Sequence, residues 1–209
     1  MKILIMGPQG AGKGTQASRI SKKLEVPHIS TGDLFREALS NGTDLGAKAK
    51  EYMNRGELVP DSIVVGMLKE RIEKEDCKKG WILDGYPRNK LQAEELDKIT
   101  KVSHMIVLTL DDDFAVQRIG GRRTCSKCGA IFHTTNLKPK KEGICDRCGG
   151  NLIQREDDKE KAIRERLKIY RNDTEPIILH YKNKGIKMIE VDGKKSIQEA
   201  FDEIMPQLR

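Results

Sequence analysis

Short apolar runs alternate with longer stretches of helical periodicity along this chain. The apolar runs predict strands at 2–6, 28–31, 80–83, 104–110 and 186–191. Apolar residues at helical spacing, with their capping residues, predict helices at 13–24, 30–40, 45–54, 61–76, 90–99, 111–121, 157–184 and 197–208. Strands that alternate with helices in this way indicate an α/β fold, with a parallel sheet covered by helices on both faces.

A glycine-rich loop joins the first predicted strand to the first helix. Residues 7–15 read Gly-Pro-Gln-Gly-Ala-Gly-Lys-Gly-Thr. Glycines allow successive backbone N–H groups to point at phosphate oxygens, and the helix that follows adds the positive end of its dipole. Lys13 supplies a full charge to the β- and γ-phosphates. Because Gly14 separates this lysine from Thr15, Mg²⁺ held through water is an alternative to direct ligation by the hydroxyl.

Polar residues follow several of the other predicted strands. Ligands of such sheets bind beyond the C-terminal ends of the strands, so 7–15, 30–33, 84–88 and 111–113 are expected to form one site. Asp84 is positioned to supply negative charge to the ligand shell of Mg²⁺, and a turn or helix-cap residue is the alternative. Arg88 is aimed at a phosphate. The arginines that could bind phosphate chains are Arg36, Arg88, Arg118, Arg122, Arg123, Arg155, Arg164 and Arg166.

The composition limits the class of protein. The 209 residues are 37% apolar and 34% charged, enough for one aliphatic α/β core with small insertions. No run approaches the ~20 apolar residues of a membrane span, and the N-terminal apolar run fits a strand better than a signal peptide, so we expect a cytoplasmic protein. The net charge of +7 could indicate nucleic-acid binding, but the basic residues are dispersed, which favours an arginine-lined phosphate cleft.

Four of the five cysteines have the spacing of a metal site. Cys125 and Cys128 form one C-x-x-C pair and Cys145 and Cys148 a second, separated by sixteen residues. Four thiolates can close tetrahedrally on Zn²⁺ and leave no open position, so the metal is expected to be structural. A nucleic-acid-binding zinc ribbon is the alternative, which the lysines of 138–141 would permit. Cys77 is expected to be an unpaired structural thiol.

Taken in order, four motifs resemble the adenylate kinase family in its long form, which has a large lid. They are the 7–15 loop, Ser30-Thr-Gly-Asp-Leu-Phe-Arg, Asp84-Gly-Tyr-Pro-Arg and Gly121-Arg-Arg. The resemblance covers essentially the whole chain and implies the P-loop nucleoside monophosphate kinase fold. It implies a core of 1–29, 60–120 and 159–209, an AMP-binding insert of 30–59, and a zinc-binding lid of 121–158.

The resemblance also implies the roles of individual residues, with zinc on the four cysteines of the lid. ATP would be bound by Gly10, Ala11, Gly12, Lys13, Gly14, Thr15, Arg118, Arg122, Ile131, Phe132 and Lys195, the last through its backbone. AMP would be bound by Thr31, Arg36, Met53, Glu57, Leu58, Val59, Gly85, Tyr86, Pro87, Arg88, Gln92, Arg155 and Arg166. The catalytic set would be Lys13, Asp84, Arg88, Arg122, Arg155 and Arg166.

The reaction implied is reversible transfer of the terminal phosphoryl group of MgATP to AMP, which gives two ADP and serves purine nucleotide interconversion and energy homeostasis. The acceptor phosphate is already ionised, so the reaction requires no general base and depends on alignment and charge. We expect a monomer without nucleic-acid or membrane partners.

Two alternatives remain open. A kinase of another nucleoside monophosphate is the first, against which Thr31 and Gln92 favour adenine. An ATP-dependent nucleic-acid-binding protein is the second, although it leaves 30–59 and 84–88 unexplained.

Overall fold

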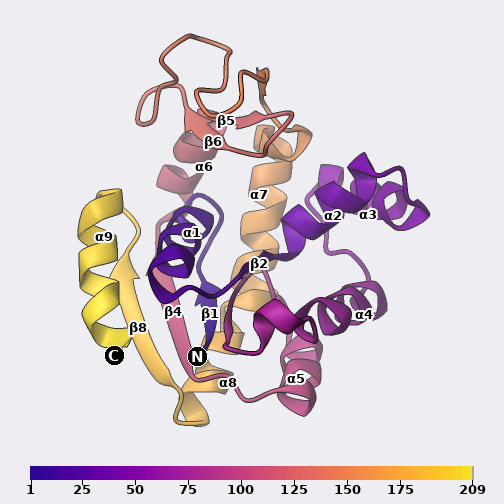
Figure 1. Cartoon of the computed structure of the whole chain (residues 1–209), viewed down its shortest axis with the longest axis vertical. Helices are drawn as coiled ribbons and strands as arrows, with labels where there is room; N and C mark the ends of the chain where they lie inside the picture. The colour runs from indigo at the N-terminus through magenta and orange to yellow at the C-terminus, as the bar shows by residue number, and fades with distance from the viewer. Residues whose placement is uncertain (209) are drawn as a thin grey trace.

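A five-stranded parallel sheet forms the centre of the computed structural model, which describes residues 1–208 (Figure 1). Its strands are β1 (Lys2–Met6), β2 (His28–Ser30), β3 (Trp81–Asp84), β4 (His104–Thr109) and β8 (Lys187–Asp192), in the order β2-β3-β1-β4-β8. In the central strand β1, Leu4 is in register with Leu83 of β3 and Met105 of β4. The α/β class predicted from the apolar runs is confirmed.

Helices cover both faces of this sheet. They are α1 (Lys13–Leu24), α2 (Thr31–Ser40), α3 (Asp44–Arg55), α4 (Asp61–Ile72), α5 (Lys90–Ile99), α6 (Asp112–Gly120), α7 (Glu160–Ile169), α8 (Pro176–Asn183) and α9 (Ile197–Ile204). Ile3 and Ile5 pack with the buried residues of α1, α6, α7 and α9. Leu4 and Met6 point the other way and pack with those of α2 to α5 and α8. Alternate residues of β1 therefore serve two separate cores, which explains its continuous apolar run.

Three predicted helices are shorter than the sequence pattern indicated. α4 ends at Ile72, and a 3₁₀ turn at Glu75–Cys77 follows it. The helix expected over 157–184 is divided into a 3₁₀ turn (Glu156–Asp158), α7, a π-helical segment (Tyr170–Thr174) and α8. Pro176 lacks a backbone N–H and so begins α8 instead of continuing α7. α9 ends at Ile204, and the last residues form a 3₁₀ turn at Met205–Leu208.

Two segments project from the sheet layer. α2 and α3 extend to one side, and a small antiparallel sheet lies above the ends of α6 and α7 (Figure 1). This sheet has the order β6-β5-β7 and consists of β5 (Arg122–Cys125), β6 (Ile131–His133) and β7 (Leu152–Ile153). The apolar pattern did not predict these strands, because each is only two to four residues long. The segments lie where the sequence predicted the insert of 30–59 and the lid of 121–158, and the domain boundaries themselves stay predictions.

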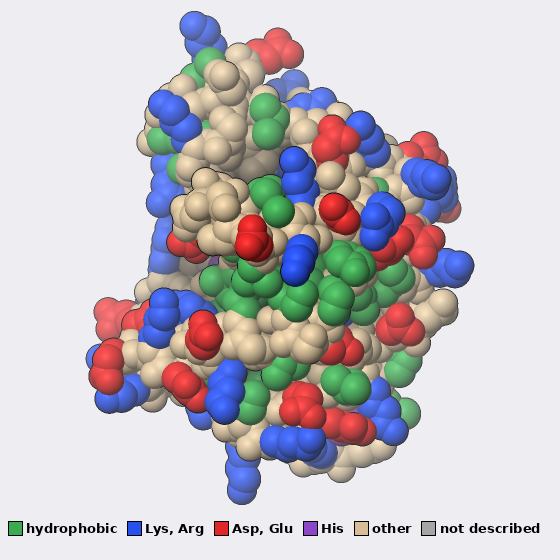
Figure 2. All heavy atoms as spheres, turned by 90° about the vertical axis from the view of Figure 1, so that its right-hand side faces the viewer, with side chains coloured by type: hydrophobic (Ala, Val, Ile, Leu, Met, Phe, Trp, Pro, Cys, Tyr) green, Lys and Arg blue, Asp and Glu red, His purple; other side chains and the backbone are tan. Residues whose placement is uncertain are grey.

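The surface that carries α2, α3 and α4 mixes both signs of charge. Lys and Arg side chains are interspersed with Asp and Glu around a central band of hydrophobic side chains (Figure 2). This face therefore presents no continuous basic area of the kind that tracks a nucleic-acid backbone. Within residues 1–208, no helix is both long enough and apolar enough to cross a membrane.

Candidate active site

One cavity of about 810 Å³ contains nearly all the residues predicted to hold nucleotides. Every predicted ATP-binding and catalytic residue lines it, and so does every predicted AMP-binding residue except Tyr86. Tyr86 is fully buried, and its hydroxyl donates to the backbone carbonyl of Gln92 at 3.0 Å. Tyr86 can therefore affect a nucleotide only through its neighbours. Arg123 and Arg164 also lie outside the lining, and Arg164 pairs with Glu160 at 2.8 Å on the exposed face of α7.

The phosphate loop leaves backbone donors at one end of the cavity. Gly10 and Gly12 have φ values of 84° and 92°, in the left-handed region that favours glycine. Gly12 is the N-cap of α1, which has no side-chain cap and no acidic residue in its first turn. The first N–H groups of this helix therefore remain available to an anion, which the helix dipole also favours.

Lys13 is held beside this loop by backbone carbonyls. Its Nζ donates to Gly7 O at 2.7 Å and to Pro8 O at 2.8 Å. Burial lowers the pKa of Lys13 to about 8, an effect that Asp84 partly offsets and Arg88 increases. Its positive charge is thus unfavourable in the folded protein until an anion approaches.

Asp84 ends β3 beside the phosphate loop. Its Oδ2 lies 3.4 Å from the position that a Cβ on Gly14 would take, and 3.5 Å from His28 Nε2. Within residues 1–208, no lysine or arginine forms an ion pair with this carboxylate. Asp84 oxygens together with the phosphate oxygens of a nucleotide are the hard donor set that Mg²⁺ prefers, so the residues fit this ion.

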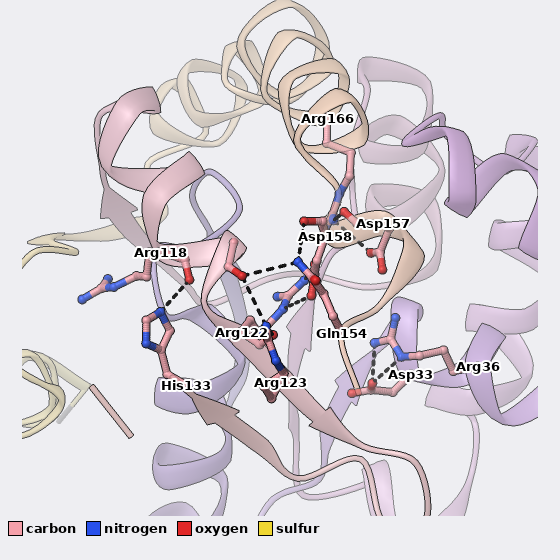
Figure 3. Close-up of polar contacts among 11 residues, drawn as sticks. Asp33, Arg36, Arg118, Arg122, Arg123, His133, Gln154, Asp157, Asp158 and Arg166 are labelled. Carbon is pink, nitrogen blue, oxygen red and sulfur yellow. Dashed lines mark hydrogen bonds and ion pairs between the residues drawn. The ribbon is translucent and has the colours of Figure 1, made fainter. Parts of the chain in front are cut away.

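Arginines held by aspartates surround the middle of the cavity (Figure 3). Arg122 makes a bidentate pair with Asp158, a residue that is 1% exposed. The corresponding pairs are Arg166 with Asp157 at 2.9 Å and Arg36 with Asp33 at 2.5 Å. These aspartates orient the guanidinium groups, which carry the planar donors suited to phosphate.

Positive charge in this region exceeds what the aspartates compensate. Burial lowers the pKa of Arg155 to about 10, and repulsion from Arg36 and Arg122 adds to the effect. Burial also lowers the pKa of Arg166 to about 10, against the opposing attraction of Asp157. The Nε of Arg155 is buried and has no hydrogen-bond partner among residues 1–208. The arrangement therefore suits ligands that carry several negative charges.

Polar side chains also define the two ends of the cavity. At the 30–59 end, Thr31 Oγ1 donates to Gly85 O at 2.9 Å, and Arg88 Nε donates to the same carbonyl at 2.7 Å. At the other end, Arg118 donates to Gly10 O and Gly193 O at 3.1 and 2.7 Å. Lys195 also lines this end, and its Nζ is paired with Glu203 of α9 at 2.5 Å.

The two lid residues predicted to bind ATP, Ile131 and Phe132, differ in exposure. Ile131 is 41% exposed, whereas Phe132 is 9% exposed and packs with Cys125 and Cys145 in the lid core. Sequence reasoning missed several further lining residues, which are Gln16, His133, Asn136, Leu137 and Gln198. No motif distinguished these positions, because the packing of α1, the lid and α9 in the folded chain brings them to the cavity.

The four lid cysteines converge as their spacing predicted. Their Sγ atoms all lie within 4.8 Å of one another, and the Cys125–Cys148 and Cys128–Cys145 separations are 3.4 and 3.7 Å. Tetrahedral Zn²⁺ with bonds of about 2.3 Å places its sulfurs roughly 3.8 Å apart, so the cluster fits this ion. Backbone N–H groups, chiefly that of Cys128, lower the pKa of Cys125. Cys77 lies outside this cluster, buried against Arg71.

Known proteins are similar to this chain over nearly its full length. A family model described as adenylate kinase matches residues 5–186. An adenylate kinase of Archaeoglobus fulgidus is 50% identical over 209 residues, which cover 98% of this chain and 96% of that protein. One of Thermodesulfovibrio yellowstonii is 52% identical, covering 98% and 97%, and one of Caldicellulosiruptor bescii is 47% identical, covering 100% and 99%. The chain belongs to the adenylate kinase family, with the P-loop nucleoside monophosphate kinase fold.

Proposed function

We propose that this enzyme catalyses the reversible, Mg²⁺-dependent transfer of the terminal phosphoryl group of ATP to AMP, giving two ADP. The observation that carries the proposal is the cavity that joins the phosphate loop to the 30–59 segment, with half-buried cations between them. ATP phosphates would lie on residues 10–15, and AMP would lie between the 30–59 segment and residues 85–92. The transferred group would then pass between Arg88, Arg122, Arg155 and Arg166.

Alignment and charge are sufficient for this chemistry. The acceptor phosphate has a second pKa of about 6, so its attacking oxygen is ionised at neutral pH without a general base. Lys13 and the arginines would hold both phosphate chains in line and stabilise the charge that spreads over the transferred group. Mg²⁺ near Asp84, bound with the nucleotide, would neutralise part of that charge. Closure of the lid over the cavity would exclude water that could otherwise hydrolyse ATP.

The cysteine cluster would act on this reaction only through the lid. Cys125, Cys128, Cys145 and Cys148 would bind one structural Zn²⁺. The apolar core of the lid is small, consisting of three buried residues with Ala130 and Leu152 against them, so a bound metal would supply stability that burial cannot. The expected role in purine nucleotide homeostasis, the monomeric state and the cytoplasmic location stay predictions.

Initial rates with separate acceptors test the proposed reaction. We expect ADP formation from ATP with AMP to exceed that with GMP, CMP or UMP by at least 10²-fold, because a site built to hydrogen-bond one base rejects others strongly. Arg88→Met should lower kcat/KM for AMP by at least 10²-fold, because it removes a half-buried cation from the phosphates. Arg164→Met, on the exposed face of α7, is the matched control and should keep full activity. ATP hydrolysis that oligonucleotides stimulate and that needs no AMP would instead support the nucleic-acid-binding alternative.

A further inference from the structure

The side-chain amide of Gln92 is fixed by two partners of opposite kind. Gln92 lies in the first turn of α5, is 1% exposed and lines the cavity at its 30–59 end. Its Nε2 donates to Asp61 Oδ1 at 2.6 Å, and its Oε1 accepts from the backbone N–H of Arg88 at 2.8 Å. Each amide atom retains one further hydrogen-bonding position, since the nitrogen carries two hydrogens and the oxygen two lone pairs.

These partners permit only one orientation of the amide. An ionised carboxylate can only accept hydrogen bonds and a backbone N–H can only donate. Rotating the amide by half a turn would bring its oxygen against the Asp61 carboxylate and its nitrogen against the Arg88 N–H. Both hydrogen bonds would be lost and two repulsive contacts would replace them.

Asp61 is itself held in place from a second direction. It is the first residue of α4, and it receives Asn89 Nδ2 at 2.9 Å on Oδ1 and 3.2 Å on Oδ2. Asn89 is the N-cap of α5, where its Oδ1 accepts from the backbone N–H of Gln92 at 2.8 Å. Asp61 does not line the cavity. It can therefore influence a bound nucleotide only through the residues that it positions.

We propose that Asp61 sets the base selectivity of the acceptor site by fixing the orientation of the Gln92 amide. Adenine presents a donor at N6 and an acceptor at N1, whereas hypoxanthine and guanine present an acceptor at O6 and a donor at N1. An amide oriented for one of these edges is reversed for the other. Asp61 is thus a positioning residue for specificity, and this role rests on the proposed contact between Gln92 and the AMP base.

The test compares AMP with inosine monophosphate, whose base differs from adenine at this edge alone. The measured quantity is the ratio of kcat/KM for AMP to kcat/KM for inosine monophosphate. Asp61→Ala removes one of the two fixed partners, so we expect this ratio to fall roughly tenfold, with most of the change in KM. An unfolded fraction of enzyme lowers both rates equally and leaves the ratio unchanged. Asp61→Ser replaces the alanine variant if the latter does not fold.

Asp61→Asn is the matched control, because its Oδ1 can still accept from both Gln92 and Asn89. We expect its ratio to stay within about threefold of the original. This result would show that the hydrogen-bond acceptor at position 61, and not its negative charge, sets the selectivity. An unchanged ratio in Asp61→Ala would overturn the inference. Gln92→Leu separates this result from a failure of the proposed AMP site, since it should raise KM for AMP if Gln92 contacts the base. If Gln92→Leu leaves KM for AMP unchanged, the proposed base contact fails, and the role of Asp61 fails with it.

Discussion

Replacing Lys13 by methionine should abolish phosphoryl transfer and yet stabilise the nucleotide-free protein. The substitution keeps an unbranched side chain, one heavy atom shorter than lysine, and removes its charge. In the folded protein the pKa of Lys13 is lowered from 10.5 to about 8, mainly because burial removes water from the ammonium group. The charged form at neutral pH therefore opposes folding, and methionine relieves that cost.

The size of the effect follows from the pKa shift. A pKa of about 8 in place of 10.5 corresponds to at most about 3 kcal/mol of unfavourable free energy when the lysine is charged, because the side chain is half-buried and water in the cavity screens part of the effect. Lys13 lines an open cavity and donates to Gly7 and Pro8, and each lost hydrogen bond offsets about 1 kcal/mol. Water in the cavity can replace the lost partners of these carbonyls in part. We therefore expect Lys13→Met to gain about 1–3 kcal/mol of unfolding free energy at pH 7.

The sign of the pH dependence gives a second check. Between about pH 8 and 10.5 the unfolded chain binds more protons at Lys13 than the folded chain, so the stability of the original protein rises across this window. The advantage of Lys13→Met should be complete below about pH 8 and should disappear near pH 10.5. Other titrating groups are common to both proteins and cancel in the difference.

Urea unfolding of both proteins at pH 7 and pH 10, with zinc kept constant, measures this difference. Lys48→Met on the exposed surface of α3 is the control, and it should change stability by less than about 0.5 kcal/mol. A Lys13→Met protein that is less stable than the original at pH 7, or an advantage that persists unchanged at pH 10, would refute the reasoning. Retained turnover in this variant would refute the proposed role of Lys13 in catalysis.

Two further predictions concern the lid and the ion pairs that support the cavity. Cys128→Ser should lower zinc affinity at least 100-fold and expose residues 121–158 to proteolysis, because three thiolates and an alcohol bind the metal less well than four thiolates do. Cys77→Ser is the control, and this variant should keep its zinc. Equal zinc content in the two variants would contradict the assignment of the metal site. Asp158→Ala should lower the unfolding free energy by about 3–5 kcal/mol in urea, since it leaves the Arg122 guanidinium, which is only 18% exposed, without its partner. A loss below about 1 kcal/mol would exclude such a role.

The parts of this fold that the sequence predicted are those with local signals. The β1 strand and the loop at 7–15 were recognisable because a buried parallel strand is continuously apolar and a phosphate loop needs glycine at fixed positions. The cysteine cluster was recognisable because both C-x-x-C turns are short and regularly spaced. These features depend on a few adjacent residues, so the pattern carries them without knowledge of the tertiary structure.

Other features depend on contacts between distant segments and had no such signal. The single helix expected over 157–184 is interrupted by the π-helical segment before Pro176, where the backbone N–H of Glu175 donates to Tyr170 O. The pairing of Asp61 with Gln92 joins residues 31 positions apart on two helices, and nothing in either local pattern indicates it. Nothing in the sequence indicated that Tyr86 is buried away from the cavity, because its neighbours in the motif do line the cavity.

The same cations that destabilise the nucleotide-free enzyme explain how nucleotide binding could promote the reaction. Burial lowers the pKa of Lys13, Arg88, Arg155 and Arg166, so each of these side chains carries its charge at an energetic cost. Phosphate anions would remove that cost, and most fully when both chains meet and negative charge gathers on the transferred group. Stabilisation would then be greater in the transition state than with either nucleotide alone. The gain in stability of Lys13→Met and its loss of turnover are therefore two measurements of one electrostatic arrangement.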